Sequence, residues 1–427
     1  MSGVERAAQD DVPTQWLPVA SVAPPPPAQR VSSPATSQTA PGPAADAAGP
    51  ARARDRLYEI DALRILAAFA VVIYHYTFAD YAGALTHLRF DTVSLLTRYG
   101  YLGVDLFFVI SGFVVLLSAI GRRPDQFVIS RMVRLYPAFW VSVTITTLVL
   151  VLFSAGQFRV TLFQYVANMT MFDSLVNVQN IDVVYWTLWA ELRFYVLVFA
   201  LVCWGITRGR LTAVMWAWLA VTAVLDLSIP PGPVQSLLTL ALQPEWSHYF
   251  IAGMALCLVY KFGMSPQLGV ILVASYALAV HRAIDFGDKV GMRYGTTIHR
   301  WAVIAIITAI FIVMTFVALR HSARFGRAWF AIFGALTYPL YLVHDRVGVV
   351  LFNRFGAHLN RWLVLVLVIA VAFAVAYLVY RFVERPFAPV FKRFLTRLAE
   401  QIGLGRDGPG WWQTRRGTDV PRHRAPS

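Results

Sequence analysis

The stretch IDALRILAAFAVVIYHYTF, residues Ile60 to Phe78, decides the fold class of this protein. A membrane-spanning helix needs about 20 apolar residues, and this stretch meets that need although it contains Arg64 and His75. Eleven helical steps of 100° place these two side chains about 20° apart around the helix and about 16 Å apart along it. Because ionisable groups are costly in hydrocarbon, we expect their shared face to meet a partner or a water-filled cavity inside a helix bundle.

The composition of the whole chain indicates a multi-pass membrane protein. Of its 427 residues 58% are hydrophobic and 14% are charged, whereas soluble proteins contain about 25% charged residues. The mean hydropathy is +0.58. The formal charge of +14 fits topology signals and contact with anionic lipid, and the basic residues are too dispersed to favour a nucleic-acid partner. Cys203 and Cys257 lie in apolar runs, so we expect buried thiols, with no disulfide and no metal site.

Apolar runs divide the chain into an all-α integral membrane domain with two tails. The domain is expected over residues 57–393. Residues 1–55 hold 10 of the 23 prolines and predict a disordered, Pro/Ala-rich tail, and residues 403–427 predict a flexible polar tail. The ten predicted spans are 62–81, 102–120, 135–154, 189–207, 211–229, 244–261, 266–281, 301–319, 330–352 and 362–383. Glu384 and Arg385 are expected to anchor the last span, and Pro386 to end its helix.

The distribution of basic residues predicts the orientation of these spans. Ten spans place both tails on one side of the membrane. The loops on that side hold ten basic residues and those on the other side nine, so the loops alone hardly decide. Seven further basic residues border the first and last spans, giving seventeen against nine. We therefore expect an inner (plasma) membrane protein with both termini in the cytoplasm.

His75 and Asp105 are candidate catalytic residues. Entering near Asp61, the first helix would place His75 about 20 Å deep in a hydrocarbon core about 30 Å thick. Asp105, near the outer end of the second span, is expected to lie within reach and to orient the imidazole. The alternatives are a neutral His75 bonded to a neighbouring helix, Asp105 as a helix N-terminal charge, and Arg64 reaching back to the interface.

The same residues resemble a known family. LRILAAFAVVIYH resembles the Arg-x10-His motif of the acyltransferase 3 family of integral membrane acyltransferases, and GVDLFFVISGF resembles its second-span signature. Four later stretches follow in the family's order, and the resemblance covers about residues 57 to 393. These stretches are SRMVRLYPAFW, YWTLWAELRFY, LTYPLYLVH and VERPF.

The resemblance implies an activity. It implies a ten-span core that takes an acyl group from a cytoplasmic donor, commonly acyl-CoA, and passes it to a hydroxyl, usually of a sugar. His75 would be the essential catalytic residue and Arg64 its partner. Leu192 and Arg193 stand where the family often has a second acidic residue, and Asp345 stands where a proline frequently follows the late histidine. These departures bear on the acceptor more than on the reaction.

Arg131 and Arg134 are candidates for binding the donor. They lie three residues apart in the predicted cytoplasmic loop after the second span, so on a helix they share a face. Two guanidinium groups there suit the phosphates of CoA. Without the resemblance, flanking charges that set the topology would be the better interpretation.

Three aromatic residues near a carboxylate suggest a carbohydrate site. Trp186, Trp189 and Tyr195 surround Glu191 in the sequence, after the longest predicted outer loop. Stacking on the rings and hydrogen bonds to the carboxylate suit a sugar at the outer mouth. An interfacial aromatic belt is the alternative.

A second ionisable cluster lies in the ninth predicted span. Pro339 is expected to kink this helix, and His344, Asp345 and Arg346 follow at membrane depth. Three consecutive side chains point in different directions, so some of them must pair inside the protein. His344 is a second candidate for the substrate cavity, and a structural role is the alternative.

Together these features predict a membrane O-acyltransferase that moves an acyl group, with acetyl as the first candidate, from acyl-CoA to an extracytoplasmic or lipid-linked carbohydrate. His75 would act as general base or as nucleophile. No permanently bound cofactor is expected, and the partners are acyl-CoA, the acceptor and the bilayer. A proton-coupled transporter is the alternative, although no inverted repeat is evident. A non-catalytic scaffold is the third class.

Overall fold

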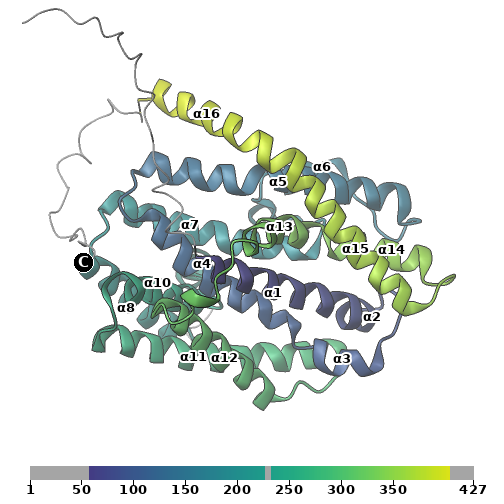
Figure 1. The fold of residues 1–427 in the computed structure, drawn as a ribbon, viewed down its shortest axis with the longest axis horizontal. Coiled ribbons are helices and arrows are strands. Elements are labelled where there is room, and N and C mark those ends of the chain that lie inside the picture. The colour runs from purple at the N-terminus through teal and green to yellow at the C-terminus, as the bar shows by residue number, and fades with distance from the viewer. Residues whose placement is uncertain (1–56, 227–231, 404–427) are drawn as a thin grey trace, which may run out of the picture. The chain divides into compact units, whose positions relative to one another are not determined.

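The computed structural model describes residues 57–226 and 232–403. The predicted tail at residues 1–55 lies outside this range, as does residue 404 onward of the predicted C-terminal tail. The described residues form helices and loops and no strand, which confirms the all-α prediction (Figure 1).

The helices follow one another along the chain with short connections. In order they are α1 (Tyr58–Tyr74), η2 (His75–Ala79), α2 (Asp80–Ala82), α3 (Asp91–Thr97), η3 (Gly100–Leu102), α4 (Gly103–Ala119), α5 (Pro124–Phe153), α6 (Leu162–Met169), η4 (Asp173–Val176), η5 (Val183–Tyr185), α7 (Trp186–Trp204), α8 (Arg208–Asp226), α9 (Pro233–Leu242), α10 (Ser247–Phe262), α11 (Pro266–Tyr294), α12 (Arg300–Ala318), η6 (Ala323–Phe325), α13 (Phe330–Val343), α14 (Asp345–Phe355), α15 (Arg361–Val379), η7 (Tyr380–Glu384) and α16 (Arg385–Gln401).

Seven helical segments among the described residues are long and apolar enough to cross a membrane, and they coincide with seven of the ten predicted spans. These segments are Tyr58–Ala82, Asp91–Ala119, Pro124–Phe153, Val183–Trp204, Pro266–Tyr294, Arg300–Ala318 and Arg361–Gln401. The other three predicted spans coincide with α8, with the 16-residue α10, and with the pair α13 and α14, which is divided at His344. The count of ten therefore stays a prediction.

Three helix contacts fix the centre of the bundle, where α1 packs against α4 and α13, and α4 packs against α10 (Figure 1). The α4–α10 contact is a close approach of backbones, because a Cβ atom on Gly253 would lie 2.8 Å from the Cα of Gly112. The α1–α4 contact is similar, since a Cβ atom on Gly103 would lie 2.6 Å from the carbonyl oxygen of Ala67. Small residues permit such contacts between helices in membranes.

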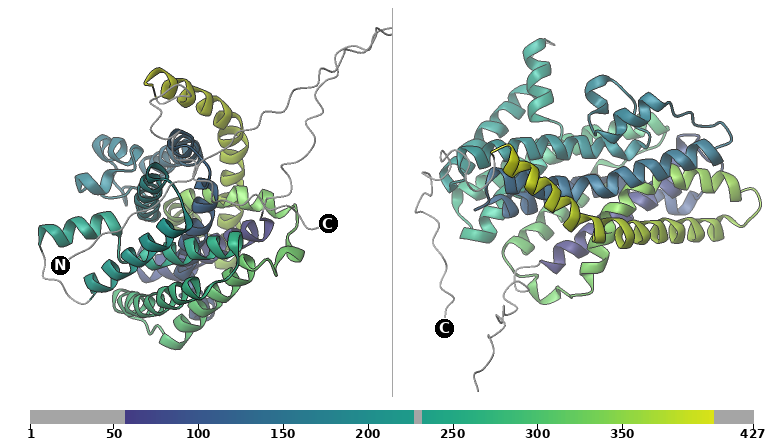
Figure 2. Two further views of the ribbon diagram at one scale, coloured as in Figure 1. Left: turned by 90° about the vertical axis from the view of Figure 1, so that its left-hand side faces the viewer. Right: turned by 90° about the horizontal axis from the view of Figure 1, so that it is seen from above.

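The C-terminal helix extends beyond the predicted last span. The π-helical turn η7 joins α15 to α16, and α16 packs against α5 (Figures 1 and 2). The prediction that Pro386 ends the helix is wrong. Pro386 lies in the first turn of α16, directly after the π turn η7, and the helix continues past it to Gln401.

Candidate active site

A π-helical turn at His75 shapes one end of the site. The backbone N–H of Asp80 donates to the carbonyl of His75, five residues earlier. In an α-helix, residue 80 would lie about 140° around the axis from residue 75. The wider π turn reduces this angle, so Oδ1 of Asp80 lies 3.6 Å from Nδ1 of His75. Sequence reasoning missed Asp80, because the α-helical period does not place it on the face of His75.

Asp345 makes the shortest contact with His75. Its Oδ1 lies 2.7 Å from Nδ1 of the imidazole, and its side chain is 1% exposed. Asp345 is the first residue of α14, directly after the break at His344. Nε of Arg346 lies 3.7 Å from Oδ2 of Asp345, and the backbone N–H of Arg346 donates to Asp182 at 3.1 Å. The carboxylate of Asp345 therefore lies between an imidazole and a guanidinium group.

The structure corrects the predicted partner of His75, because Asp345 and Asp80 contact the imidazole and Asp105 does not. Asp105 is buried and shares a hydrogen bond with Tyr249 of α10. The reason is the packing of α4, whose Gly103 faces α1. Two residues further on, the helix has turned by about 200°, which directs Asp105 away from α1.

His344 lies beside His75, with ring centroids 5.2 Å apart. Its Nδ1 is 2.8 Å from the carbonyl oxygen of Tyr341. Because a carbonyl only accepts, this nitrogen carries the proton and Nε2 is left as an acceptor. Within the described residues Nε2 has no hydrogen-bond partner, although the side chain is fully buried.

A cavity of about 60 Å³ lies beside the first half of α1, and its lining is distinct from the His75 cluster. Arg64 lies at its wall, and Nε of Arg64 has no hydrogen-bond partner among the described residues. Tyr341 also lines the cavity and receives a hydrogen bond of 3.0 Å from Thr187. The Tyr341 ring also lies beside His344, with ring centroids 5.7 Å apart. The remaining lining residues are Val104, Phe107, Phe108, Ser111, Leu188, Glu191, Thr337 and Tyr338.

Glu191 lines the same cavity as Arg64. The sequence predicted a different place for it, at an outer mouth. Its Oε1 accepts hydrogen bonds from Ser111 at 3.1 Å and from Tyr195 at 2.5 Å. Trp186 packs on Trp246 with ring centroids 5.1 Å apart. Trp189 packs separately, on Phe172. The expected cluster of Glu191 with three aromatic side chains is therefore not formed, and a role of these residues in binding substrate stays a prediction.

The two arginines of α5 lie on the Arg64 side of the cavity. The Arg131 guanidinium lies 5.6 Å from the ring centre of Tyr195. The Arg134 guanidinium lies 5.3 Å from the ring centre of Tyr338, and its Nη1 is 3.8 Å from Glu384. The structure thus brings both predicted donor-binding arginines to the same region as Arg64.

Among the described residues, one group of side chains could hold a metal ion. The ligand atoms of His75, Asp80 and Asp345 lie within 4.8 Å of one another, and imidazole with carboxylates suits several divalent cations. The distance of 2.7 Å between Nδ1 of His75 and Oδ1 of Asp345 is that of a close ion-pair contact, which already occupies this nitrogen. The absence of a metal or cofactor stays a prediction.

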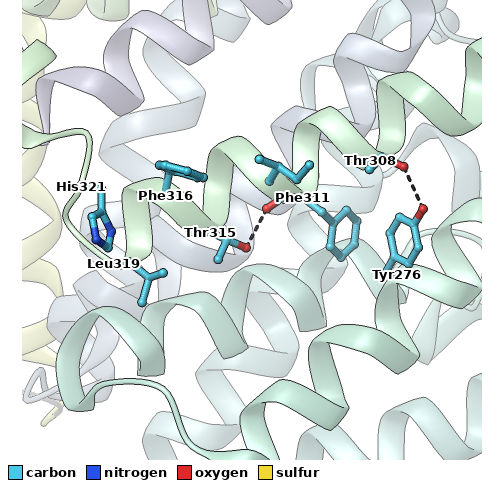
Figure 3. Close-up of a pocket in the computed structure, with 8 residues that line it drawn as sticks. Tyr276, Thr308, Phe311, Thr315, Phe316, Leu319 and His321 are labelled. Carbon is cyan, nitrogen blue, oxygen red and sulfur yellow. Dashed lines mark hydrogen bonds between the residues drawn. The ribbon is translucent and has the colours of Figure 1, made fainter.

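A larger hollow of about 370 Å³ lies between α11 and α12, outside this cluster (Figure 3). A hydrogen bond between Tyr276 and Thr308 closes one part of it, and His321 lies at the other end. The lining between them is mainly apolar and includes Phe311 and Phe316. Because no charged side chain lines the hollow, it does not compete with the His75 cluster as a catalytic site.

One comparison with known proteins matches the range of the chain that carries the cluster. A family model described as an acyltransferase domain matches residues 57–381. No curated protein and no solved structure matches the chain. The matched range contains His75, its two carboxylate neighbours, the whole lining of the cavity and both arginines of α5.

Proposed function

Because the chain belongs to the acyltransferase 3 family, we propose that it transfers an acyl group from cytoplasmic acyl-CoA to a hydroxyl of an extracytoplasmic or lipid-linked carbohydrate. Acetyl is the first candidate for the acyl group. One observation carries the proposal: the imidazole of His75 lies 2.7 Å from the buried carboxylate of Asp345, and Arg64 lines a cavity beside the same helix. The imidazole–carboxylate pair suits a base for acyl transfer, and the arginine suits an anionic donor.

The donor would bind at the Arg64 side of the cavity. Arg131 and Arg134 would contact the phosphates of CoA, with Arg64 deeper along the path of the pantetheine arm. The cavity of about 60 Å³ holds about two water molecules. Entry of the arm therefore requires movement of lining side chains, and Tyr338 is the candidate because it contacts Arg134.

The reaction would take place at Nε2 of His75. Nδ1 of His75, 2.7 Å from the carboxylate of Asp345, would carry the proton of the neutral imidazole, which would leave Nε2 able to accept the proton of the acceptor hydroxyl. The hydroxyl oxygen then forms a bond to the thioester carbon, and the carbon–sulfur bond breaks. The imidazolium returns its proton to the departing CoA thiolate. Asp345 stabilises the imidazolium between these two steps.

A covalent route is the alternative for the same residues. Nε2 of His75 would attack the thioester carbon directly, CoA would leave, and the acyl-imidazole would pass its acyl group to the hydroxyl. Rapid acid quenching of protein mixed with acetyl-CoA, followed by mass spectrometry of the peptide that contains His75, distinguishes the routes. An added acetyl group supports the nucleophile, and unmodified peptide during turnover supports the base.

The experiment that tests the function uses purified protein and radiolabelled acetyl-CoA. We expect release of CoA thiol and transfer of label to glycans of the cell envelope, and His75→Ala should abolish both. His87→Ala is the matched control, because His87 is exposed and lies outside the cluster. Transfer by the His75→Ala variant at the wild-type rate would rule out the proposal.

A further inference from the structure

The helix that contains α15 and α16 is too long for a single membrane crossing. It has 41 residues, from Arg361 to Gln401, so at 1.5 Å per residue it extends about 62 Å, twice the thickness of a hydrocarbon core of about 30 Å. The π turn η7 and the prolines Pro386 and Pro389 mark the junction between its two parts. Since α15 supplies the apolar part of the crossing, α16 must lie outside it.

One half of the apolar surface of α16 is covered by α5. Phe391, Leu395 and Ala399 are buried and lie at four-residue spacing. The ring of Phe391 packs against Trp140 of α5, with centroids 5.7 Å apart. These contacts hold α16 against the first half of α5.

The other half of this apolar surface is exposed in the structure. Phe387, Val390, Phe394 and Leu398 are between 42% and 59% exposed. They follow one another at three- and four-residue spacing, so they form a continuous stripe along the helix. The stripe borders the covered residues, because Phe394 lies about 60° around the helix from Phe391. We call these four residues the exposed stripe.

Positive charges line the polar side of the same helix. Arg385, Lys392, Arg393 and Arg397 are exposed, and none of them forms an ion pair within the described part of the chain. Glu400 is the one acidic residue between Arg385 and Gln401. A helix with an apolar face and a basic polar face is typical of segments that lie in the membrane interface and attract anionic lipid.

We infer that α16 is a membrane-surface helix that binds the anionic phospholipid leaflet, with the exposed stripe at the boundary of headgroups and acyl chains and the four cations at lipid phosphates. Two observations favour anionic lipid as the partner of the exposed stripe. The stripe continues directly from a membrane crossing, and its charges have the sign that complements anionic lipid. A second copy of the chain would bring like charges together, which disfavours pairing through this surface.

Docking of α16 would also position α5. The covered face of α16 packs on the part of α5 that carries Arg131 and Arg134. Glu384, directly before α16, lies 3.8 Å from Arg134. Contact with the leaflet would therefore hold the arginines to which the proposed function assigns the donor, a consequence that rests on that function. The lipid contact itself does not depend on it.

The test measures the depth of α16 in vesicles that contain the full chain. A fluorophore is attached to the Leu398→Cys variant in a Cys203→Ser background. The remaining Cys257 is buried, so the label should react with the new cysteine. Lipids with a quencher near the headgroup are mixed into phosphatidylcholine alone or into equal parts of phosphatidylcholine and phosphatidylglycerol. We expect several-fold stronger quenching in the anionic vesicles and loss of that difference when Lys392, Arg393 and Arg397 are changed to Gln.

Two controls keep the result specific. Arg324→Gln with Arg327→Gln removes exposed cations outside α16 and should leave the quenching unchanged. Phe394→Gln should weaken it in both kinds of vesicle. Equal quenching in both vesicles, or energy transfer between labelled copies without quenching, would overturn the inference. Neither result depends on cleavage of acetyl-CoA, so failure of the proposed function is recognised separately.

Discussion

The first helical segment, α1 with the π turn η2 that follows it, carries an ionisable side chain near each end, but the surroundings of the two side chains differ. At the far end His75 is tightly paired, with Asp345 at 2.7 Å and Asp80 at 3.6 Å. At the near end Arg64 borders a cavity, and its Nε has no hydrogen-bond partner among the described residues. An imidazole paired with a carboxylate through Nδ1 suits catalysis, because Nε2 stays available to accept a proton, whereas a guanidinium beside a cavity suits binding of an anion. The contrast supports the proposal of catalysis at one end and donor recognition at the other.

The largest effect is expected at the His75 end. Asp345→Asn removes the negative charge that orients the imidazole and stabilises the imidazolium, so release of CoA from acetyl-CoA should fall by at least about 100-fold. Purified variants are compared by thiol release after folding is checked by gel filtration. Asp105→Asn is the matched control, because Asp105 is also buried but faces Tyr249. A larger loss with Asp105→Asn than with Asp345→Asn would reverse the assignment of partners.

A smaller effect with a different kinetic signature is expected at the Arg64 end. Arg131→Ala should raise KM for acetyl-CoA about tenfold with little change in kcat, since loss of a charge-assisted contact costs about 1.4 kcal/mol or more. Arg131→Lys keeps the charge and should recover part of the affinity. Steady-state kinetics at low and high salt test whether this contact is electrostatic. Screening by salt should raise KM of the wild type more than KM of Arg131→Ala. An unchanged KM removes Arg131 from the donor site.

The smallest effect is expected between the two ends. Thr187→Val removes the hydroxyl that donates to Tyr341 and keeps the shape of the side chain. Because one neutral hydrogen bond contributes about 1 kcal/mol, activity should change by no more than about fivefold. A loss as large as that of Asp345→Asn would mean that Tyr341 takes a direct part in the reaction and that the two ends are not separate.

The sequence identified many residues of the site but not the pairing between them. Arg64 and His75 were found because eleven residues of regular α-helix bring them to one face, and α1 is unbroken from Arg64 to Tyr74. The π turn that follows is not visible in a periodic pattern, so Asp80 was missed. Glu191 was expected at an outer mouth, yet it lies in the cavity with Arg64, because side-chain contacts with Ser111 and Tyr195 decide its direction.

The sequence by itself determined the membrane class, the family and the two ionisable positions of α1, since hydropathy, motif order and helical spacing are local properties of the chain. Only the tertiary structure decided that Asp345, 270 residues away, rather than Asp105 partners His75. That choice depends on which face each helix turns toward α1. The close approach of Gly103 to Ala67 sets the face of α4, and the break at His344 brings Asp345 to the imidazole. Such packing is a property of the whole bundle, and no single stretch of sequence contains it.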